Sequence, residues 1–180
     1  MLYRLRRFLE YDSKRDVSVI VGLEKEYNGR LSLAKHTIRC TAKVDRIETN
    51  ANGDIVVIDY KTGGKVKTPL KSNILADLDC ADRSVIVKNI RSLQLPLYLY
   101  FVMDEYPDAV CDAALYNVRT LDLTYFSKKV EAFPFETSLK VCFQAIDSLV
   151  DELFESDIPF IPDDSDPALC RYCLYKGLCR

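Results

Sequence analysis

The apolar run Ile55–Ile58 constrains the fold of this chain more than any other feature, because charged residues follow it directly. Four consecutive branched apolar residues after the turn signal Asn50–Asp54 indicate a short buried strand. Asp59 and Lys61 come next, and a glycine pair ends the run. A carboxylate beside a buried strand is costly unless it is paired or binds a metal. The sequence therefore predicts a strand that carries charged side chains to one end of a sheet.

Apolar spacing and turn residues predict further helices and strands around this run. The expected elements are helices 2–15, 90–104 and 139–154 and strands 17–27, 31–47, 55–58, 113–118 and 121–126. Turns are expected at Asn28–Gly29 and Asn50–Asp54, and irregular stretches at 65–87 and 158–167. Pro96 fits helix 90–104 best in its first turn. Strands interleaved with helices predict a mixed α/β or α+β sheet flanked by helices.

The chain has the composition of one soluble domain, with 180 residues of which 48% are hydrophobic. No apolar run approaches the roughly 18 to 20 residues that span a bilayer, and the N-terminus has no signal-peptide pattern. A cytoplasmic protein without membrane contact is therefore expected. We expect residues 1–169 to form the domain core and residues 170–180 to pack on it as a cysteine-bearing tail.

The charge of the chain is weakly acidic and unevenly distributed. A formal net charge of −2 argues against a nucleic-acid partner, because phosphate binding usually leaves a basic footprint. Residues 61–91 nevertheless carry seven Lys or Arg against three Asp, whereas residues 151–166 carry seven acids and no base. A cationic segment therefore follows the strand that ends near Lys61.

Two acids and a lysine are predicted to meet at one end of the sheet. Strand side chains alternate between faces, so Asp59 and Lys61 project from the same side, and Asp45 comes from the neighbouring strand. Two carboxylates and the Tyr60 carbonyl oxygen suit a hard cation such as Mg²⁺. The cation lowers the pKa of a bound water, and Lys61 orients that water or offsets charge on a phosphate. The pattern indicates phosphodiester hydrolysis.

The same residues also have a simpler interpretation. An Asp followed two residues later by a Lys is a common charge pattern of exposed strands. The position of Asp59 directly after a buried run argues against that interpretation, because a buried acid needs a partner or a metal. The second acid-bearing strand, Val44–Ile47, argues against it further.

Three segments, Ala42–Ile47, Asp59–Gly63 and Gln94–Tyr98, read A-K-V-D-R-I, D-Y-K-T-G and Q-L-P-L-Y. They resemble the RecB-like branch of the PD-(D/E)XK nuclease superfamily, which has a G-x-x-D-R-I-D strand, a D-Y-K-T-G strand and a helix with Q-x-x-x-Y. The resemblance covers roughly residues 17–180. The D-Y-K-T-G segment is the most specific of the three, and their order strengthens the match.

The resemblance implies a restriction-endonuclease-like core that acts as a metal-dependent deoxyribonuclease. Asp45 and Asp59 would bind Mg²⁺ or Mn²⁺, Lys61 would be the catalytic lysine, and Gln94 and Tyr98 would line the site or steady the DNA. The spacing of Gln94 and Tyr98 places them on one helix face, where an ordinary half-buried pair is the alternative. The implied context is an exonuclease module of a recombination or repair helicase-nuclease, which receives single strands or unwound DNA ends from a helicase domain or subunit.

Three cysteines near the C-terminus, Cys170, Cys173 and Cys179, have C-x2-C-x5-C spacing. Compact thiolate spacing suits zinc or an iron–sulfur cluster, and three free thiols are the alternative. The resemblance favours a [4Fe–4S] cluster of the kind found in AddB-type helicase-nucleases and RecB-like CRISPR-associated exonucleases. Their fourth cysteine lies upstream of the nuclease strands and has no counterpart here, so we expect this chain to be a fragment of a longer protein.

Other candidate ligands are weaker. The remaining cysteines fit the role of small hydrophobes better than that of a fourth cluster ligand: Cys40, Cys80, Cys111 and Cys142. His36 is expected on the opposite strand face from Asp45, and Glu24 and Glu26 are expected to be solvated.

Two further functional classes remain open from the sequence. A non-catalytic DNA-binding or scaffold module with a metal-stapled tail would keep the fold without cutting DNA, although it has no need to retain Asp45, Asp59 and Lys61 together. In a zinc-bound interaction domain, the cysteine tail would carry the function and the acidic motif would be incidental.

Overall fold

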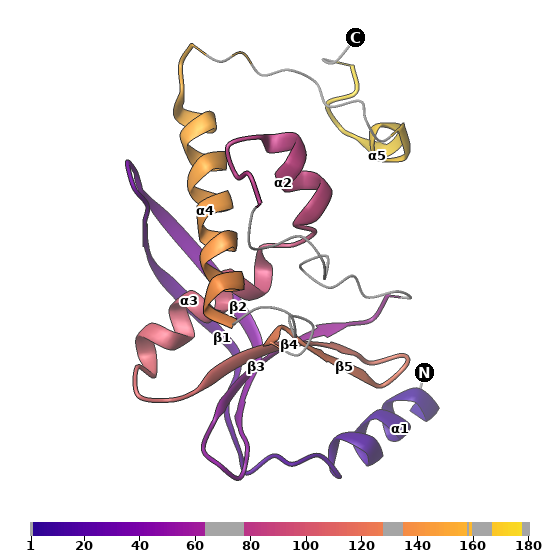
Figure 1. The fold of residues 1–180 in the computed structure, drawn as a ribbon. Coiled ribbons are helices and arrows are strands. Elements are labelled where there is room, and N and C mark those ends of the chain that lie inside the picture. Colours follow the sequence, from indigo (N-terminus) through magenta and orange to yellow (C-terminus); the bar gives the residue numbers. More distant parts are fainter. Residues whose placement is uncertain (1, 64–77, 128–134, 158, 160–166, 178–180) are drawn as a thin grey trace.

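The computed structural model describes residues 2–63, 78–127, 135–157, 159 and 167–177. Within these residues, five strands form one mixed sheet in the order β1-β2-β3-β4-β5 (Figure 1). The strands are β1 Val19–Ser32, β2 Thr37–Thr49, β3 Ile55–Lys61, β4 Cys111–Asn117 and β5 Asp122–Tyr125. The helices are α1 Leu2–Asp12, α2 Arg83–Asn89, α3 Gln94–Glu105, α4 Phe135–Phe154 and α5 Pro167–Tyr172. The predicted mixed sheet with flanking helices is confirmed.

The centre of the sheet is a parallel pair of strands, β3 and β4. The chain between them contains α2 and α3, as a crossover between parallel strands requires. The other neighbouring strands pair antiparallel. Lys61 is opposite Asn117 in the parallel register, so β3 and β4 end at the same edge of the sheet.

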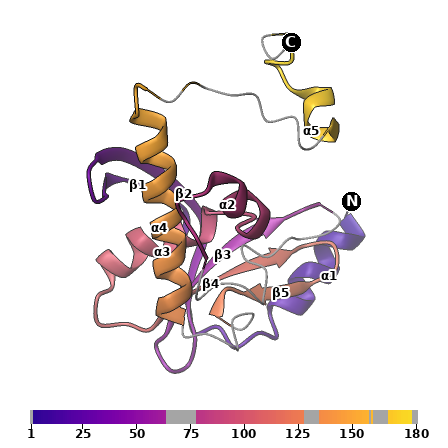
Figure 2. The same cartoon turned by 45° about the horizontal axis from the view of Figure 1, so that its top comes forward.

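The helices lie on both faces of the sheet. The views in Figures 1 and 2 place α2, α3 and α4 on one face and α1 on the other. The larger apolar core lies under α3 and α4 and includes Val57, Leu99 and Cys142. A smaller cluster on the α1 side centres on Ile58 and Tyr116, against which Phe8 packs. Because both faces are covered, β3 is buried along most of its length, as its apolar sequence predicts.

The turn predicted at Asn28–Gly29 is wrong, because β1 continues through both residues and pairs Gly29 with Cys40. The chain reverses instead after Ser32, where the Leu33 N–H donates to the His36 carbonyl at 2.8 Å. A Cβ atom on Gly29 would lie 2.7 Å from the Phe101 ring. This glycine therefore permits close approach of α3 to β1, a role that its sequence neighbourhood does not distinguish from a turn.

The turn predicted at Asn50–Asp54 is confirmed. The Asn50 side-chain carbonyl accepts hydrogen bonds from the N–H groups of Asn52 at 2.9 Å and Asp54 at 3.0 Å. Gly53 has a φ of +84°, which few other residues adopt at low cost. This turn connects β2 to β3 and so sets how the two acid-bearing strands lie together.

The helix predictions are confirmed in outline and corrected in detail. Pro96 lies in the first turn of α3, as expected. The stretch 65–87 is not wholly irregular, because α2 begins at Arg83, where the Asp82 carboxylate accepts a hydrogen bond from the Ser84 N–H. Residues 64–77 and most of the predicted loop 158–167 lie outside the described residues.

The apolar spacing of α1 predicted an amphipathic helix, but none of its described residues is fully buried. Phe8 packs on Tyr60 and Tyr116, whereas Leu2, Leu5 and Leu9 are exposed. No helix among the described residues combines the length and the apolar character needed to cross a membrane.

Candidate active site

The middle of β2 and the end of β3 bring the predicted acids and lysine together on the α3 face of the sheet. Ile55 and Val57 face the core beneath α3, so the alternation of strand side chains continues on that face with Asp59 and Lys61. The last backbone pair between β2 and β3 joins Arg46 to Ile58. Asp45 precedes Arg46 in the sequence and therefore lies just outside the paired region. The site is therefore built where β2 and β3 begin to separate.

Lys61 connects β3 to α3 at this edge. Its ammonium nitrogen forms an ion pair with Asp59 Oδ2 at 2.6 Å and donates a hydrogen bond to Gln94 Oε1 at 2.9 Å. The Gln94 side-chain N–H in turn donates to the Tyr98 hydroxyl at 2.7 Å. Gln94 and Tyr98 are one helical turn apart, as their spacing predicted. The four side chains form a continuous polar chain from the strand to the helix.

Asp45 is fixed by the main chain of the neighbouring strand. Its Oδ2 atom accepts a hydrogen bond from the Tyr60 N–H at 2.7 Å. The Tyr60 side chain points to the α1 face, where it packs on Phe8 and accepts a hydrogen bond from Arg46. Tyr60 can therefore contribute to a site on the α3 face through its main chain only.

The site concentrates negative charge in a buried setting. The Asp59 side chain is only 4% exposed, whereas that of Lys61 is 37% exposed. Burial raises the pKa of Asp59, the ion pair with Lys61 lowers it, and the nearby Asp45 carboxylate raises it, with a net upward direction. Burial also raises the pKa of Tyr98, and both carboxylates add to that shift. The tyrosine hydroxyl therefore stays protonated at neutral pH.

The residues present fit a hard divalent cation. Asp45 and Asp59 offer carboxylate oxygens, which Mg²⁺ and Mn²⁺ prefer, and the two carboxylates repel each other in a buried site. Bound positive charge would relieve that repulsion. The described residues contain no cluster of three His, Cys, Asp or Glu, so the remaining ligands would be a main-chain carbonyl, solvent and substrate oxygens.

The buried charge of Asp59 should make the metal-free protein less stable at neutral pH. Because the folded-state pKa lies above the ordinary value of 3.8, this carboxyl stabilises the fold at low pH, and that contribution is lost as the pH rises through the folded value. We expect Asp59→Asn to raise the melting temperature in EDTA at pH 7 by roughly 2 to 4 °C, equivalent to about 1 kcal/mol in a domain of this size.

Thermal unfolding of both proteins between pH 4 and pH 8 tests this prediction. The difference should shrink toward acid pH, where the wild-type carboxyl becomes neutral like the asparagine. A variant that melts below wild type across the whole range would contradict the expected cost of the buried charge.

The other polar candidates lie elsewhere. His36 pairs with Asp151 on α4 at 3.2 Å and stacks on Phe154, which agrees with the expectation that it is not a metal ligand at this site. Glu24 is exposed and pairs with Lys43 at 2.6 Å, and Glu26 is also exposed. The solvated interpretation of both glutamates is confirmed.

The cysteines divide into an inner and a C-terminal group. Burial raises the pKa of Cys142 to about 12 and also raises the pKa values of Cys80 and Cys111, so these thiols do not readily form the thiolates that metals bind. Cys170 lies in α5, and the Cys173 N–H donates to its carbonyl at 3.3 Å. Cys179 lies outside the described residues, so the predicted cluster of three stays a prediction.

Comparison with known proteins places this arrangement in a family. The sequence model of the PD-(D/E)XK nuclease superfamily matches residues 1–180. The chain belongs to the PD-(D/E)XK nuclease superfamily. Enzymes of this superfamily are generally metal-dependent nucleases, and a two-acid, one-lysine site at the end of a mixed sheet accords with that membership.

Two other comparisons add little to the family assignment. The crystal structure of SSO0001 aligns with this PD-(D/E)XK chain at a TM-score of 0.41 and 14% identity, covering 99% of this chain and 67% of that chain. At that TM-score the alignment supports no functional inference. None of the curated proteins compared with the chain matches it.

The sequence interpretation missed the charged residues on the α1 face of the same strands. The sequence analysis assigned no role to the Arg46 and Glu48 side chains, but both are buried and ion-paired. The available signal was their position among the apolar residues of β2, two residues apart on one face. That signal is ambiguous, because exposed strands show the same alternation.

Proposed function

We propose that this chain is a Mg²⁺- or Mn²⁺-dependent deoxyribonuclease domain that hydrolyses DNA phosphodiester bonds. The observation that carries the proposal is the position of Lys61, which lies between the buried Asp59 carboxylate and Gln94 at the end of β3. A scaffold protein has no physical need for an ammonium group bridging a buried acid and a helix at a sheet edge. Superfamily membership supports the same chemistry.

Asp45, Asp59 and the Tyr60 carbonyl would hold the metal ion. When bound, such an ion supplies Lewis acidity and lowers the pKa of its water. Lys61 would place its positive charge beside the phosphate that is cut and offset the negative charge that develops there. Gln94 would hold Lys61 in that position, and Tyr98 would in turn hold Gln94.

We further propose that the chain belongs to the RecB-like branch of the superfamily and acts as the exonuclease module of a recombination or repair helicase-nuclease. The motifs support this assignment, because the Q-x-x-x-Y helix of the RecB-like pattern contacts the motif lysine. Lys61 donates a hydrogen bond to Gln94 of that helix. A helicase domain or subunit would supply single-stranded or unwound DNA, which would compensate for the net charge of −2. We further propose that residues 1–169 form the nuclease core and that the tail 170–180 holds a [4Fe–4S] cluster through Cys170, Cys173 and Cys179.

The test is cleavage of labelled single- and double-stranded DNA in Mg²⁺, in Mn²⁺ and in EDTA. We expect cleavage with either metal and none in EDTA, with activity restored when metal is added back. Equal cleavage in EDTA would contradict metal dependence. Binding of DNA without cleavage in any metal, including when the protein is assayed with its parent helicase segment, would favour the scaffold function.

Gln94→Ala should lower the cleavage rate by roughly 10- to 100-fold, because Lys61 loses the acceptor that fixes its ammonium group. Tyr98→Phe should have a smaller effect, since it removes only the group that steadies the Gln94 amide. The measurement is single-turnover cleavage at saturating metal.

Gln144→Ala is a matched control, because Gln144 is an exposed glutamine on α4. It should cleave at the wild-type rate. If Gln94→Ala also cleaves at that rate, Gln94 does not position Lys61.

A further inference from the structure

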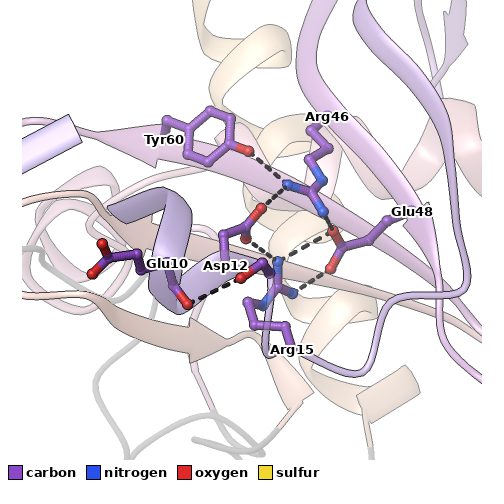
Figure 3. Close-up of polar contacts among 7 residues, drawn as sticks. Glu10, Asp12, Arg15, Arg46, Glu48 and Tyr60 are labelled. Carbon is purple, nitrogen blue, oxygen red and sulfur yellow. Dashed lines mark hydrogen bonds and ion pairs between the residues drawn. The ribbon is translucent and has the colours of Figure 1, made fainter. Parts of the chain in front are cut away.

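The α1 face of the sheet, opposite the face that carries the candidate active site, holds a largely buried charged cluster, which Figure 3 draws. We define the back-face cluster by its members: Asp12, Arg15, Arg46, Glu48 and Tyr60. Asp12 ends α1 and Arg15 follows it, whereas the other three members come from β2 and β3. Two cations and two carboxylates therefore meet between one helix and two strands.

The guanidinium of Arg46 is the centre of the back-face cluster. It lies 2.6 Å from Asp12 Oδ2, 2.6 Å from Glu48 Oε2 and 3.2 Å from the Tyr60 hydroxyl oxygen, to which it donates a hydrogen bond. Arg15 contacts both carboxylates from the other side. Arg46 is 5% exposed and Glu48 is 2% exposed, so these contacts lie in a medium that screens charge poorly. Asp12, Glu48 and Tyr60 therefore hold the Arg46 guanidinium from both the helix and the strands.

Two members of the cluster belong to the site motifs. Arg46 follows Asp45 on β2, and Tyr60 lies between Asp59 and Lys61 on β3. Side chains of successive strand residues point to opposite faces. The same short segments that present acids and lysine on the α3 face therefore present Arg46 and Tyr60 on the α1 face.

The backbone ladder does not itself hold the strands together at the site. Pairing between β2 and β3 ends at Arg46 and Ile58. Beyond the backbone pairs, Tyr60 makes side-chain hydrogen bonds from β3 to β2. Its N–H donates to Asp45 Oδ2 at 2.7 Å, and its hydroxyl accepts from Arg46 Nη1 at 3.2 Å.

We propose that Arg46 and Tyr60 are positioning residues that fix β2 against β3, so that the Asp45 and Asp59 carboxylates are held at the spacing that a divalent cation requires. The proposal rests on the proposed function, because it assumes that these carboxylates bind the metal. Asp12 and Glu48 hold the guanidinium, Arg46 holds the Tyr60 hydroxyl, and Tyr60 holds the Asp45 carboxylate through its main chain. Docking of α1 thereby acts on the metal site through the sheet.

A second tyrosine on the same face provides a matched comparison. The Tyr116 ring lies 5.8 Å from the Tyr60 ring and shares its contact with Phe8. At each position, substitution by phenylalanine removes the hydroxyl and keeps the ring. The Tyr116 hydroxyl is buried and has no hydrogen-bond partner among the described residues, whereas the Tyr60 hydroxyl joins β3 to Arg46. A general effect of losing a hydroxyl on this face should be equal at the two positions, and a positioning effect should appear only at Tyr60.

The experiment compares wild type, Tyr60→Phe and Tyr116→Phe by Mn²⁺ binding without DNA and by cleavage kinetics on single-stranded DNA. Mn²⁺ binding is followed through the electron paramagnetic resonance signal of the free ion. We expect Tyr60→Phe to weaken Mn²⁺ binding about 10-fold and to lower kcat by a similar factor, with KM for DNA unchanged. Tyr60→Phe retains the main-chain carbonyl that we assign to the metal. Tyr116→Phe should match wild type in both measurements.

Asp12→Asn provides a second variant that lies outside both strands. It weakens the hold of α1 on Arg46 and should shift Mn²⁺ affinity in the same direction as Tyr60→Phe, which covers the case in which Tyr60→Phe does not fold. Equal Mn²⁺ affinities in wild type, Tyr60→Phe and Asp12→Asn would overturn the positioning role, as would equal losses in Tyr60→Phe and Tyr116→Phe. If the wild type binds Mn²⁺ but does not cleave DNA, the nuclease function is rejected and the comparison of Mn²⁺ affinities still tests the positioning role. If the wild type binds no Mn²⁺, both proposals are rejected.

Discussion

Lys61→Ala should reduce metal-dependent DNA cleavage by at least about 100-fold while leaving the fold intact. Removing one preorganised group that stabilises charge in a transition state typically costs about 100- to 1000-fold in rate. The Lys61 ammonium is held on two sides, by Asp59 at 2.6 Å and by Gln94 at 2.9 Å, so neighbouring solvent cannot replace it in the same position. Its side chain is 37% exposed, so its truncation leaves no closed cavity in the core.

Lys43→Ala is the matched control for this prediction. Lys43 is also a strand lysine paired with an acid, but its partner is the exposed Glu24 and both groups are in solvent. We expect a wild-type cleavage rate and a near-wild-type melting temperature from Lys43→Ala, whereas Lys61→Ala should fold but melt lower, because the buried Asp59 carboxylate loses its ion pair. Retention of more than a tenth of the wild-type rate by Lys61→Ala would show that the ammonium is not part of the catalytic machinery.

The placement of Asp45, Asp59 and Lys61 was predictable from the sequence for a simple reason. Strand alternation determines the face of each side chain, and the Asn50–Asp54 turn makes the two strands neighbours. The contact between Lys61 and Gln94 was less accessible, since it depends on how α3 crosses the sheet. Only the motif resemblance linked the two segments beforehand.

The wrong turn prediction and the missed buried charges have a common physical cause. In both cases, tertiary packing overrides the local sequence signal. Asn28–Gly29 is a strong turn dipeptide, yet Gly29 pairs with Cys40 within β1, and the Phe101 ring occupies the space beside its Cα atom. Arg46 and Glu48 have the alternation of a solvated strand face, yet α1 covers them. Neither the strand position of Gly29 nor the burial of Arg46 and Glu48 can be predicted without knowing which face of the sheet each helix covers.

The burial of Arg46 leads to a large expected loss of stability on its removal. Arg46→Ala should lower the free energy of unfolding by about 3 to 5 kcal/mol, because it leaves the Glu48 and Asp12 carboxylates facing each other with one cation in place of two. Urea unfolding at neutral pH measures the change. Lys43→Ala again serves as the control on the same strand, because its exposed ion pair with Glu24 should contribute nothing measurable. A loss below about 1 kcal/mol would contradict the buried, paired state of Arg46.

The same cluster predicts that the double variant Arg46→Ala/Glu48→Ala is more stable than the sum of its single changes implies. Each single change leaves the cluster with an unbalanced buried charge, whereas the double change removes one cation and one anion together. Arg15 and Asp12 remain, 3.0 Å apart, as a neutral pair. We expect the double-variant cycle to show a coupling of about 1 to 3 kcal/mol between Arg46 and Glu48. Additive losses would mean that Arg46 and Glu48 act independently, and the back-face cluster could not then transmit the docking of α1 to the strands that carry Asp45 and Asp59.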